Sequence, residues 1–219
     1  MELYLDTANE EEIAYASQYG FLDGITTNPS IISKEKDSFE SIIRRIDSQI
    51  NGKVWMQVTK KEAGEMVKQG VEINKWVKHA VIKLPMNEDG LQAAYRLTQD
   101  NIQVNMTLIY TLPQVLLAAK ANVDYISPYI SRMDDRALDG KAFIIRAKEI
   151  IQALGAKTKV IGASIRSPQV IVDLSTQQFD AVTMPFTIYK KMFQSELTTH
   201  GLAQFDENWQ KYLVKNEGK

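Results

Sequence analysis

Short apolar runs rich in β-branched residues alternate with longer segments of helical periodicity along the whole chain. Apolar runs of this length, bounded by polar or glycine-containing segments, are typical of buried β-strands. The pattern contains eight such runs, so we predict eight strands. They cover residues 2–6, 24–28, 53–58, 80–85, 102–107, 123–129, 159–165 and 180–185.

Apolar residues in the intervening segments recur at spacings of three and four, which is typical of amphipathic helices. The predicted helices cover residues 9–19, 39–50, 61–77, 88–98, 112–121, 140–155, 167–177 and 187–197. One further helix, 202–215, follows the last strand and carries Phe205, Trp209 and Tyr212 at helical spacing. These aromatic residues predict packing against this subunit or a neighbouring one.

Strict alternation of strand and helix predicts an α/β fold, and eight units favour a closed (β/α)8 TIM barrel. We expect one domain over residues 1–219, with a C-terminal helix at about 201–215 outside the barrel. An open doubly wound sheet is the alternative, but it usually carries a glycine-rich first turn, and the first turn of this chain is not glycine-rich.

Polar residues gather at the carboxyl ends of the predicted strands, where catalytic groups of this fold converge. Residues two apart in a strand share a face. Lys83 therefore shares the inward face with Val81, and Ser164 is expected to share it with Gly162. The polar residues at the strand ends are Asp6, Asn28, Gln57, Lys83, Asn105, Thr107, Ser127, Tyr129, Ser164 and Arg166.

Composition narrows the possible partners and cofactors. Lys and Arg number 26 against 27 Asp and Glu, so the formal net charge of −1 gives no support to a nucleic-acid partner. The chain has no cysteine and only two histidines, so we expect no metal site and no disulfide. The N-terminus is acidic, unlike a signal peptide, and no run reaches the roughly 20 apolar residues of a membrane span. We therefore predict a cytoplasmic protein without a membrane partner.

Lys83 lies between Ile82 and Leu84, where a charged ammonium is disfavoured. Desolvation lowers the pKa of such an amine and frees its lone pair for attack on a carbonyl. This is the chemistry of a Schiff-base lysine. The alternative is a structural lysine whose ammonium extends to solvent or pairs with an acid. The polar residues at the other strand ends favour the Schiff-base role over this alternative.

Six motifs in the chain resemble the small transaldolase family, which includes the fructose 6-phosphate aldolases. The motifs are LDTAN, GITTNPSII, IKLP, NMTLIY, SPYISRMDD and GASIR, and the likeness extends from Glu2 through the terminal helix. The resemblance implies a class I aldolase mechanism without a cofactor. It implies the Schiff base at Lys83, acid/base chemistry at Asp6, and an amide at Asn28 that holds the intermediate.

The resemblance also implies roles for the remaining polar residues. Gln57, Thr107 and Tyr129 would hold a water and move protons, and Arg132, Ser164 and Arg166 would bind a phosphate. Thr26, Asn105 and Ser127 are expected around the rest of the substrate. The adjacent acids Asp134 and Asp135 fit acid/base work less well than helix capping or a solvated turn.

The sequence is mixed between the two branches of the family. Gln57 and Tyr129 are as in fructose 6-phosphate aldolases, whereas Asn105, Ser127 and Arg166 resemble the transaldolase branch. We predict an aldolase that cleaves or forms fructose 6-phosphate, with a transaldolase of the pentose phosphate pathway as the alternative. A metal-assisted sugar-phosphate isomerase and a silent sugar-phosphate binder are weaker alternatives. The expected partners are small sugar phosphates and further copies of the chain, a pentamer or decamer by family resemblance.

Overall fold

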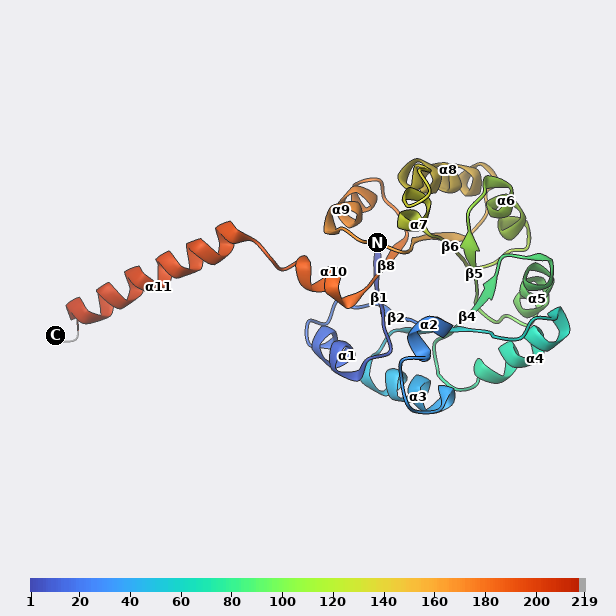
Figure 1. Cartoon of the computed structure of the whole chain (residues 1–219), viewed down its shortest axis with the longest axis horizontal. Helices are drawn as coiled ribbons and strands as arrows, with labels where there is room; N and C mark the ends of the chain where they lie inside the picture. Colours follow the sequence, from blue (N-terminus) through green and yellow to red (C-terminus); the bar gives the residue numbers. More distant parts are fainter. Residues whose placement is uncertain (217–219) are drawn as a thin grey trace.

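A computed structural model describes residues 1–216, which form a closed barrel of eight parallel strands in sequence order (Figure 1). This confirms the predicted (β/α)8 fold. The strands are β1 (Glu2–Asp6), β2 (Gly24–Thr26), β3 (Lys53–Gln57), β4 (Ala80–Pro85), β5 (Val104–Ile109), β6 (Tyr125–Pro128), β7 (Lys159–Gly162) and β8 (Ala181–Met184).

Helices surround the barrel and cover the outer faces of the strands (Figure 1). The surrounding helices are α1 (Glu10–Ser17), α3 (Phe39–Gln49), α4 (Ala63–Ile73), α5 (Glu88–Gln99), α6 (Leu112–Lys120), α8 (Gly140–Ala153), α9 (Pro168–Thr176) and α10 (Phe186–Lys191). Two short helices at the carboxyl ends of the strands were not predicted, namely α2 (Pro29–Ile32) and α7 (Ile130–Asp134). Helices this short show no measurable periodicity, although Asn28 before Pro29 is a helix-start signal.

The barrel interior is a packed core. Tyr4, Trp55, Val81, Tyr125, Ile161 and Ala181 form a buried cluster separate from the larger core between strands and helices. The Trp55 ring lies 5.1 Å from that of Tyr4 and 4.6 Å from that of Tyr125, measured between ring centroids. Since interior side chains fill the middle of the barrel, a ligand can reach only its two ends.

Charged groups close the amino-terminal end of the barrel. Glu2 accepts hydrogen bonds from Lys159 at 2.9 Å and from the Tyr4 hydroxyl at 2.7 Å. Backbone N–H groups near the starts of β1, β5 and β7 donate to the carboxylates of Asp23, Asp124 and Asp180 at 2.7, 2.8 and 2.9 Å. Each aspartate belongs to the turn before the next strand, so these bonds tie neighbouring strands together at this end.

The prediction that Gly162 of β7 faces the barrel interior is wrong. Ile161 points into the barrel, and Gly162 faces the helix layer, where a Cβ would lie 2.7 Å from a Leu174 methyl carbon. Ser164 nevertheless reaches the carboxyl-end opening, because its backbone turns into the left-handed region at φ 60°. The periodicity of two ends where the strand ends, at Gly162.

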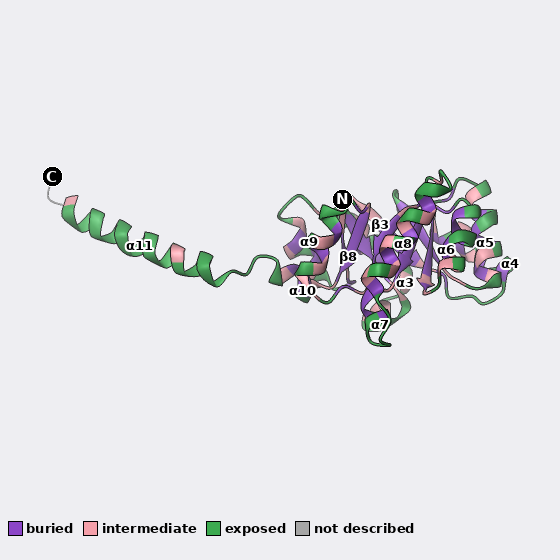
Figure 2. Cartoon of the chain, turned by 90° about the horizontal axis from the view of Figure 1, so that it is seen from above, coloured by how far each residue is buried: buried purple, intermediate pink, exposed green. Residues whose placement is uncertain are grey.

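The predicted helix 187–197 is also wrong, since α10 ends at Lys191 and α11 (Glu196–Asn216) begins shortly after. The Ser195 hydroxyl accepts the Thr198 N–H at 3.2 Å, so it acts as the cap that starts the new helix. α11 therefore begins before the predicted residue 202 and extends away from the barrel (Figures 1 and 2). Phe205 and Trp209 on this helix are 72% and 56% exposed.

Within residues 1–216, no helix combines the length and the apolar character needed to cross a membrane.

Candidate functional site

A cavity of about 100 Å³, here called the central cavity, opens at the carboxyl ends of the strands. Trp55 separates it from the packed interior, and groups from six strands and from the segments after β2, β6 and β7 form its walls. Its lining residues are Asp6, Thr26, Asn28, Trp55, Lys83, Ser127, Tyr129, Arg132, Ala163, Ser164 and Thr183. A larger hollow of about 630 Å³ lies at the opposite end, but its Lys53 and Lys159 are paired with Glu2.

Lys83 is the charged group at the centre of this arrangement. Its side chain is buried, and its Nζ donates to the Thr27 carbonyl oxygen at 2.8 Å. Burial lowers the pKa of Lys83, and the negative charge of Asp6 opposes the shift in part. Desolvation disfavours the ammonium form, so Lys83 is more readily a neutral nucleophilic amine than a surface lysine is.

The TTNPS motif explains why the Thr27 carbonyl faces Lys83. The Thr27 hydroxyl and N–H both donate to the Trp55 carbonyl, at 2.7 and 3.1 Å, which fixes the chain after β2. Asn28 then caps α2, and its Oδ1 accepts the Ile31 N–H at 3.1 Å. With Oδ1 engaged, the Nδ2 group of Asn28 is the part that can donate to a ligand in the central cavity.

Two threonine hydroxyls orient the carboxylate of Asp6. Thr26 Oγ1 donates to Asp6 Oδ1 at 2.7 Å and lies 2.6 Å from Thr183 Oγ1. Because the Thr26 hydroxyl proton goes to Asp6, Thr183 donates to Thr26. Thr183 is not among the polar strand ends predicted from the sequence, yet the two-residue periodicity of the last strand points to it, since Thr183 shares a face with inward Ala181.

Tyr129 joins β6 to α7 and presents its hydroxyl near the cavity wall. Burial, reinforced by the negative charge of Asp6, raises the pKa of Tyr129. The Thr107 hydroxyl donates to it at 3.3 Å, and the Arg132 guanidinium lies 4.8 Å from the ring centroid. Tyr129 is therefore a neutral proton donor, with Thr107 behind it and Arg132 at the rim.

Ser127 and Asn105 form a pair in the next part of the wall. Ser127 Oγ donates to Asn105 Oδ1 at 2.9 Å, and the buried Nδ2 of Asn105 has no hydrogen-bond partner within residues 1–216. An unsatisfied buried amide is costly, so a bound molecule or water near it would be favoured. Asn105 pairs with Lys83 in the sheet register, so it lies beside Lys83 on the neighbouring strand.

Gln57 and Arg166 are not among the residues that line the central cavity. Gln57 lines a neighbouring, mostly apolar hollow of about 280 Å³ that shares Asn28 with the central cavity, and it is the register partner of Lys83 in β3. Arg166 is exposed and bound to Asp135. Most of the predicted set therefore lines the central cavity or flanks Lys83 in the sheet, while Thr107 contributes through Tyr129.

Among residues 1–216, no three His, Cys, Asp or Glu side chains are close enough to hold a metal ion. The central cavity offers a desolvated amine, an oriented carboxylate, a neutral phenol and an amide donor. This set fits addition of an amine to a carbonyl compound, followed by proton transfers.

Solved structures share this fold at low sequence identity. Two structures of the carboxyl transferase domain of Rhizobium etli pyruvate carboxylase, one with 3-bromopyruvate and one with pyruvate and biocytin, match 84% of this chain with TM-scores of 0.62 and 0.63. Their identities of 11% and 12% support a common barrel fold only. The match spans 39% and 40% of those solved chains.

Curated relatives match over nearly the full length. Proteins named "Probable transaldolase" from Lactiplantibacillus plantarum and Petrotoga mobilis are 38% and 40% identical, covering 97% of this chain and 98% and 96% of theirs. One from Methanococcus maripaludis is 38% identical over 97% of this chain and 99% of its own length. Residues 3–217 match the family model described as "Transaldolase/Fructose-6-phosphate aldolase". The match to the family model and the full-length relatives agree with the (β/α)8 barrel and with the cavity around Lys83. The chain therefore belongs to the transaldolase/fructose-6-phosphate aldolase family.

Proposed function

We propose that this chain is a transaldolase that transfers a dihydroxyacetone unit between sugar phosphates through a Schiff base on Lys83. The observation that carries the proposal is the buried amine of Lys83, with its lowered pKa, in a cavity that also contains Asp6. A lysine with only a structural role would be expected to form an ion pair with an acid, whereas Lys83 donates to the Thr27 carbonyl and the Asp6 carboxylate accepts from Thr26.

The first half of the reaction uses the amine. Neutral Lys83 attacks C2 of a ketose phosphate such as fructose 6-phosphate, and the resulting carbinolamine loses water to form an iminium ion. Asn28 would hold the substrate hydroxyls next to the amine, and Tyr129 can donate the proton that leaves with the water. The positive iminium then accepts the electron pair of the breaking carbon–carbon bond.

The second half requires a base. Asp6 takes the proton of the C4 hydroxyl, the C3–C4 bond breaks, and an aldose phosphate leaves while an enamine stays on Lys83. Thr26 and Thr183 do not touch the substrate in this scheme and act as positioning residues, because they fix the direction of the Asp6 carboxylate. Arg132 at the rim is suited to hold the terminal phosphate.

The fate of the enamine separates the two branches. The names of the relatives support transfer to a second aldose, as do Asn105, Ser127 and Arg166. Gln57 and Tyr129 favour the aldolase branch instead, and Gln57 is the register partner of Lys83 in β3. Release of dihydroxyacetone, the aldolase reaction, is the second candidate, since the neutral Tyr129 hydroxyl could protonate the enamine carbon.

Trapping and acceptor dependence test the proposal together. Borohydride with fructose 6-phosphate should leave a covalent adduct on Lys83, seen by peptide mass spectrometry, and Lys83→Met should give none. Glyceraldehyde 3-phosphate should be released in sustained turnover only when erythrose 4-phosphate is present. No adduct in the wild type would refute the Schiff base, and turnover without acceptor would select the aldolase.

We also propose that α11 packs against a second copy of the chain. It is 21 residues long, extends away from its own barrel, and contains no buried residue (Figure 2). Leu202, Phe205 and Val214 are 62%, 72% and 74% exposed. An apolar surface of this kind on a separate helix is usually covered in an assembly. Five- and tenfold assemblies are the numbers implied by the family resemblance.

A further inference from the structure

The guanidinium of Arg166 is occupied by the carboxylate of Asp135. Its Nη1 and Nη2 atoms donate to Asp135 Oδ1 and Oδ2 at 2.5 and 2.7 Å. Two parallel hydrogen bonds are the geometry by which a guanidinium binds a carboxylate or a phosphate. The edge of Arg166 that could receive a substrate phosphate is therefore already bound to an internal anion.

Both partners lie next to residues that line the central cavity. Arg166 follows Ser164 by two residues, and the buried Ile165 between them holds the backbone in place. Asp135 comes directly after α7, whose Arg132 lines the cavity. α7 projects from the barrel at the carboxyl ends of the strands (Figure 2). The ion pair thus bridges two segments at the rim, where rotation of the Arg166 side chain alone would redirect its guanidinium.

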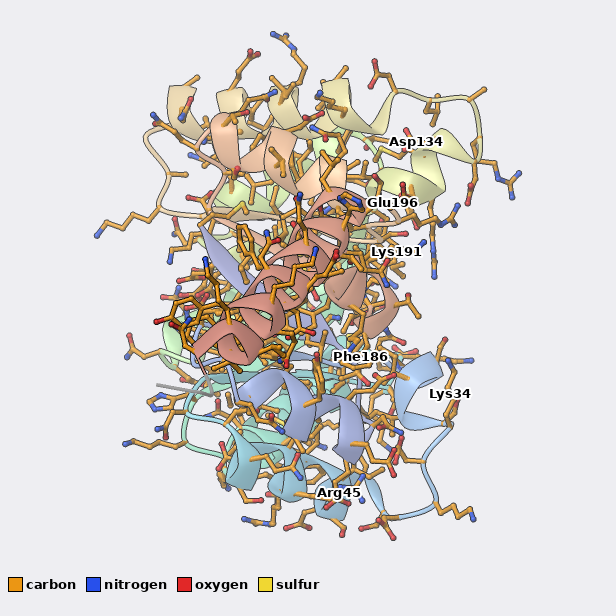
Figure 3. The ribbon with its side chains drawn as sticks, turned by 90° about the vertical axis from the view of Figure 1, so that its left-hand side faces the viewer. Lys34, Arg45, Asp134, Phe186, Lys191 and Glu196 are labelled. Carbon is orange, nitrogen blue, oxygen red and sulfur yellow. The ribbon has the colours of Figure 1, made fainter. Side chains whose placement is uncertain are left out.

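The neighbouring carboxylate has a different role. Asp134 Oδ1 accepts the Gly140 N–H at 3.0 Å, so it holds the loop that leads into α8. Figure 3 shows Asp134 and Lys34 on the same side of the molecule, Asp134 near the top of the view and Lys34 lower down. Among residues 1–216, the hydrogen bonds of the Asp135 side chain go to Arg166 alone, and Arg166 holds the pKa of Asp135 below its usual range. Asp135 is consequently an ionised competitor for the arginine.

We propose that Asp135 is a specificity-determining residue: an internal counter-ion of Arg166 that the terminal phosphate of the substrate displaces. The inference rests on the proposed function, because it assumes a phosphorylated sugar at Lys83. Side chains of Arg166 and Asp135 are 59% and 48% exposed, and exposed ion pairs are weak, so the exchange costs little. A doubly charged phosphate gains more from the guanidinium than a carboxylate does.

The exchange distinguishes phosphorylated from neutral sugars. A neutral sugar leaves the Arg166–Asp135 pair intact and gains nothing from it, whereas a phosphate ester gains a second guanidinium beside Arg132. The opposite outcome belongs to a carboxylate that holds Arg166 in the position that binds phosphate. The two roles predict opposite effects of removing the carboxylate charge.

Asp135→Asn tests the exchange, with Asp173→Asn as the matched control. Asp173 pairs with Lys141 at 2.5 Å on the helix layer, so both variants remove one carboxylate from a partly exposed ion pair. The half-saturating concentration for borohydride trapping is measured for fructose 6-phosphate and for fructose. Trapping reports the Schiff base in a transaldolase and in an aldolase alike.

Asp135→Asn should lower the half-saturating concentration of fructose 6-phosphate about three- to fivefold, an effect that shrinks with added salt. Fructose should be unaffected, Asp173→Asn should behave as the wild type, and Arg166→Gln should abolish the gain in the double variant. An unchanged or higher half-saturating concentration in Asp135→Asn would overturn the exchange.

A second measurement keeps the inference separate from the proposed function. Inorganic phosphate alone should raise the midpoint of thermal unfolding at lower concentrations in Asp135→Asn than in the wild type. If fructose 6-phosphate gives no adduct in the wild type, the proposed function fails and this comparison decides on Asp135. Equal phosphate dependence in the two proteins would then refute its role as a displaced counter-ion.

Discussion

Thr26→Val tests whether the hydroxyl chain from Thr183 through Thr26 orients the carboxylate of Asp6, the proposed base. Valine has nearly the shape of threonine, so the change removes the hydroxyl without opening a cavity. It breaks the 2.7 Å bond to Asp6 and leaves the Thr183 hydroxyl without its 2.6 Å partner. The turnover number should fall, while binding of the sugar should change little.

The magnitude follows from the charge on the acceptor. A hydrogen bond to an ionised group contributes about 1.5–3 kcal/mol, and about 1.4 kcal/mol is a factor of ten in rate. Thr26→Val should therefore lower kcat roughly 10- to 100-fold. Thr183→Val removes a neutral hydrogen bond worth about 1 kcal/mol and leaves the Thr26–Asp6 bond intact, so its loss should be no more than about fivefold.

The assay is steady-state transfer from fructose 6-phosphate to erythrose 4-phosphate, with urea unfolding of each variant as a control for stability. Borohydride trapping separates imine formation at Lys83 from the cleavage step that needs Asp6. The reasoning is refuted if Thr26→Val retains wild-type kcat, or if Thr183→Val costs as much as Thr26→Val in proteins of equal stability.

The other predictions concern Lys83, the interior core and α11. Because burial lowers the pKa of Lys83, the rate of trapping should rise with pH along a curve whose midpoint lies below the ordinary lysine value of about 10.4; a midpoint at or above that value would contradict the buried amine. Trp55→Ala should lower the free energy of unfolding by about 3–5 kcal/mol in urea titrations, whereas a loss under about 1 kcal/mol would show a loosely packed interior. Phe205→Ser with Trp209→Ser should reduce the mass in light scattering to that of a smaller assembly, and an unchanged mass would exclude α11 as a contact between copies.

Local periodicity was sufficient for the barrel and for Lys83. The alternation of strand and helix depends on residues that are close together in the chain. The Lys83 side chain points inward because Val81, two residues before it in the same strand, also points inward. The same rule applied to the last strand would have found Thr183. Strand facing is readable because a side chain within a regular strand has only two directions available.

Beyond the ends of the strands, only the tertiary structure determines where the side chains lie. Ser164 reaches the central cavity through a left-handed backbone turn, and Arg166, two residues further on, lies in an ion pair with Asp135. The preference for an aldolase depended on Gln57 and Tyr129, and the names of the relatives support a transaldolase better.

The sequence by itself determined the fold, the family and the inward amine, because each depends on short-range patterns or on the spacing of residues within one strand or motif. Only the tertiary structure decided that Asp135 holds Arg166, that Thr26 and Thr183 orient Asp6, and that α11 begins at Glu196 and leaves the barrel. These are contacts between residues 20 to 157 positions apart, or turns set by one hydroxyl. No periodicity encodes such contacts, since the chain must close into a barrel before the partners meet.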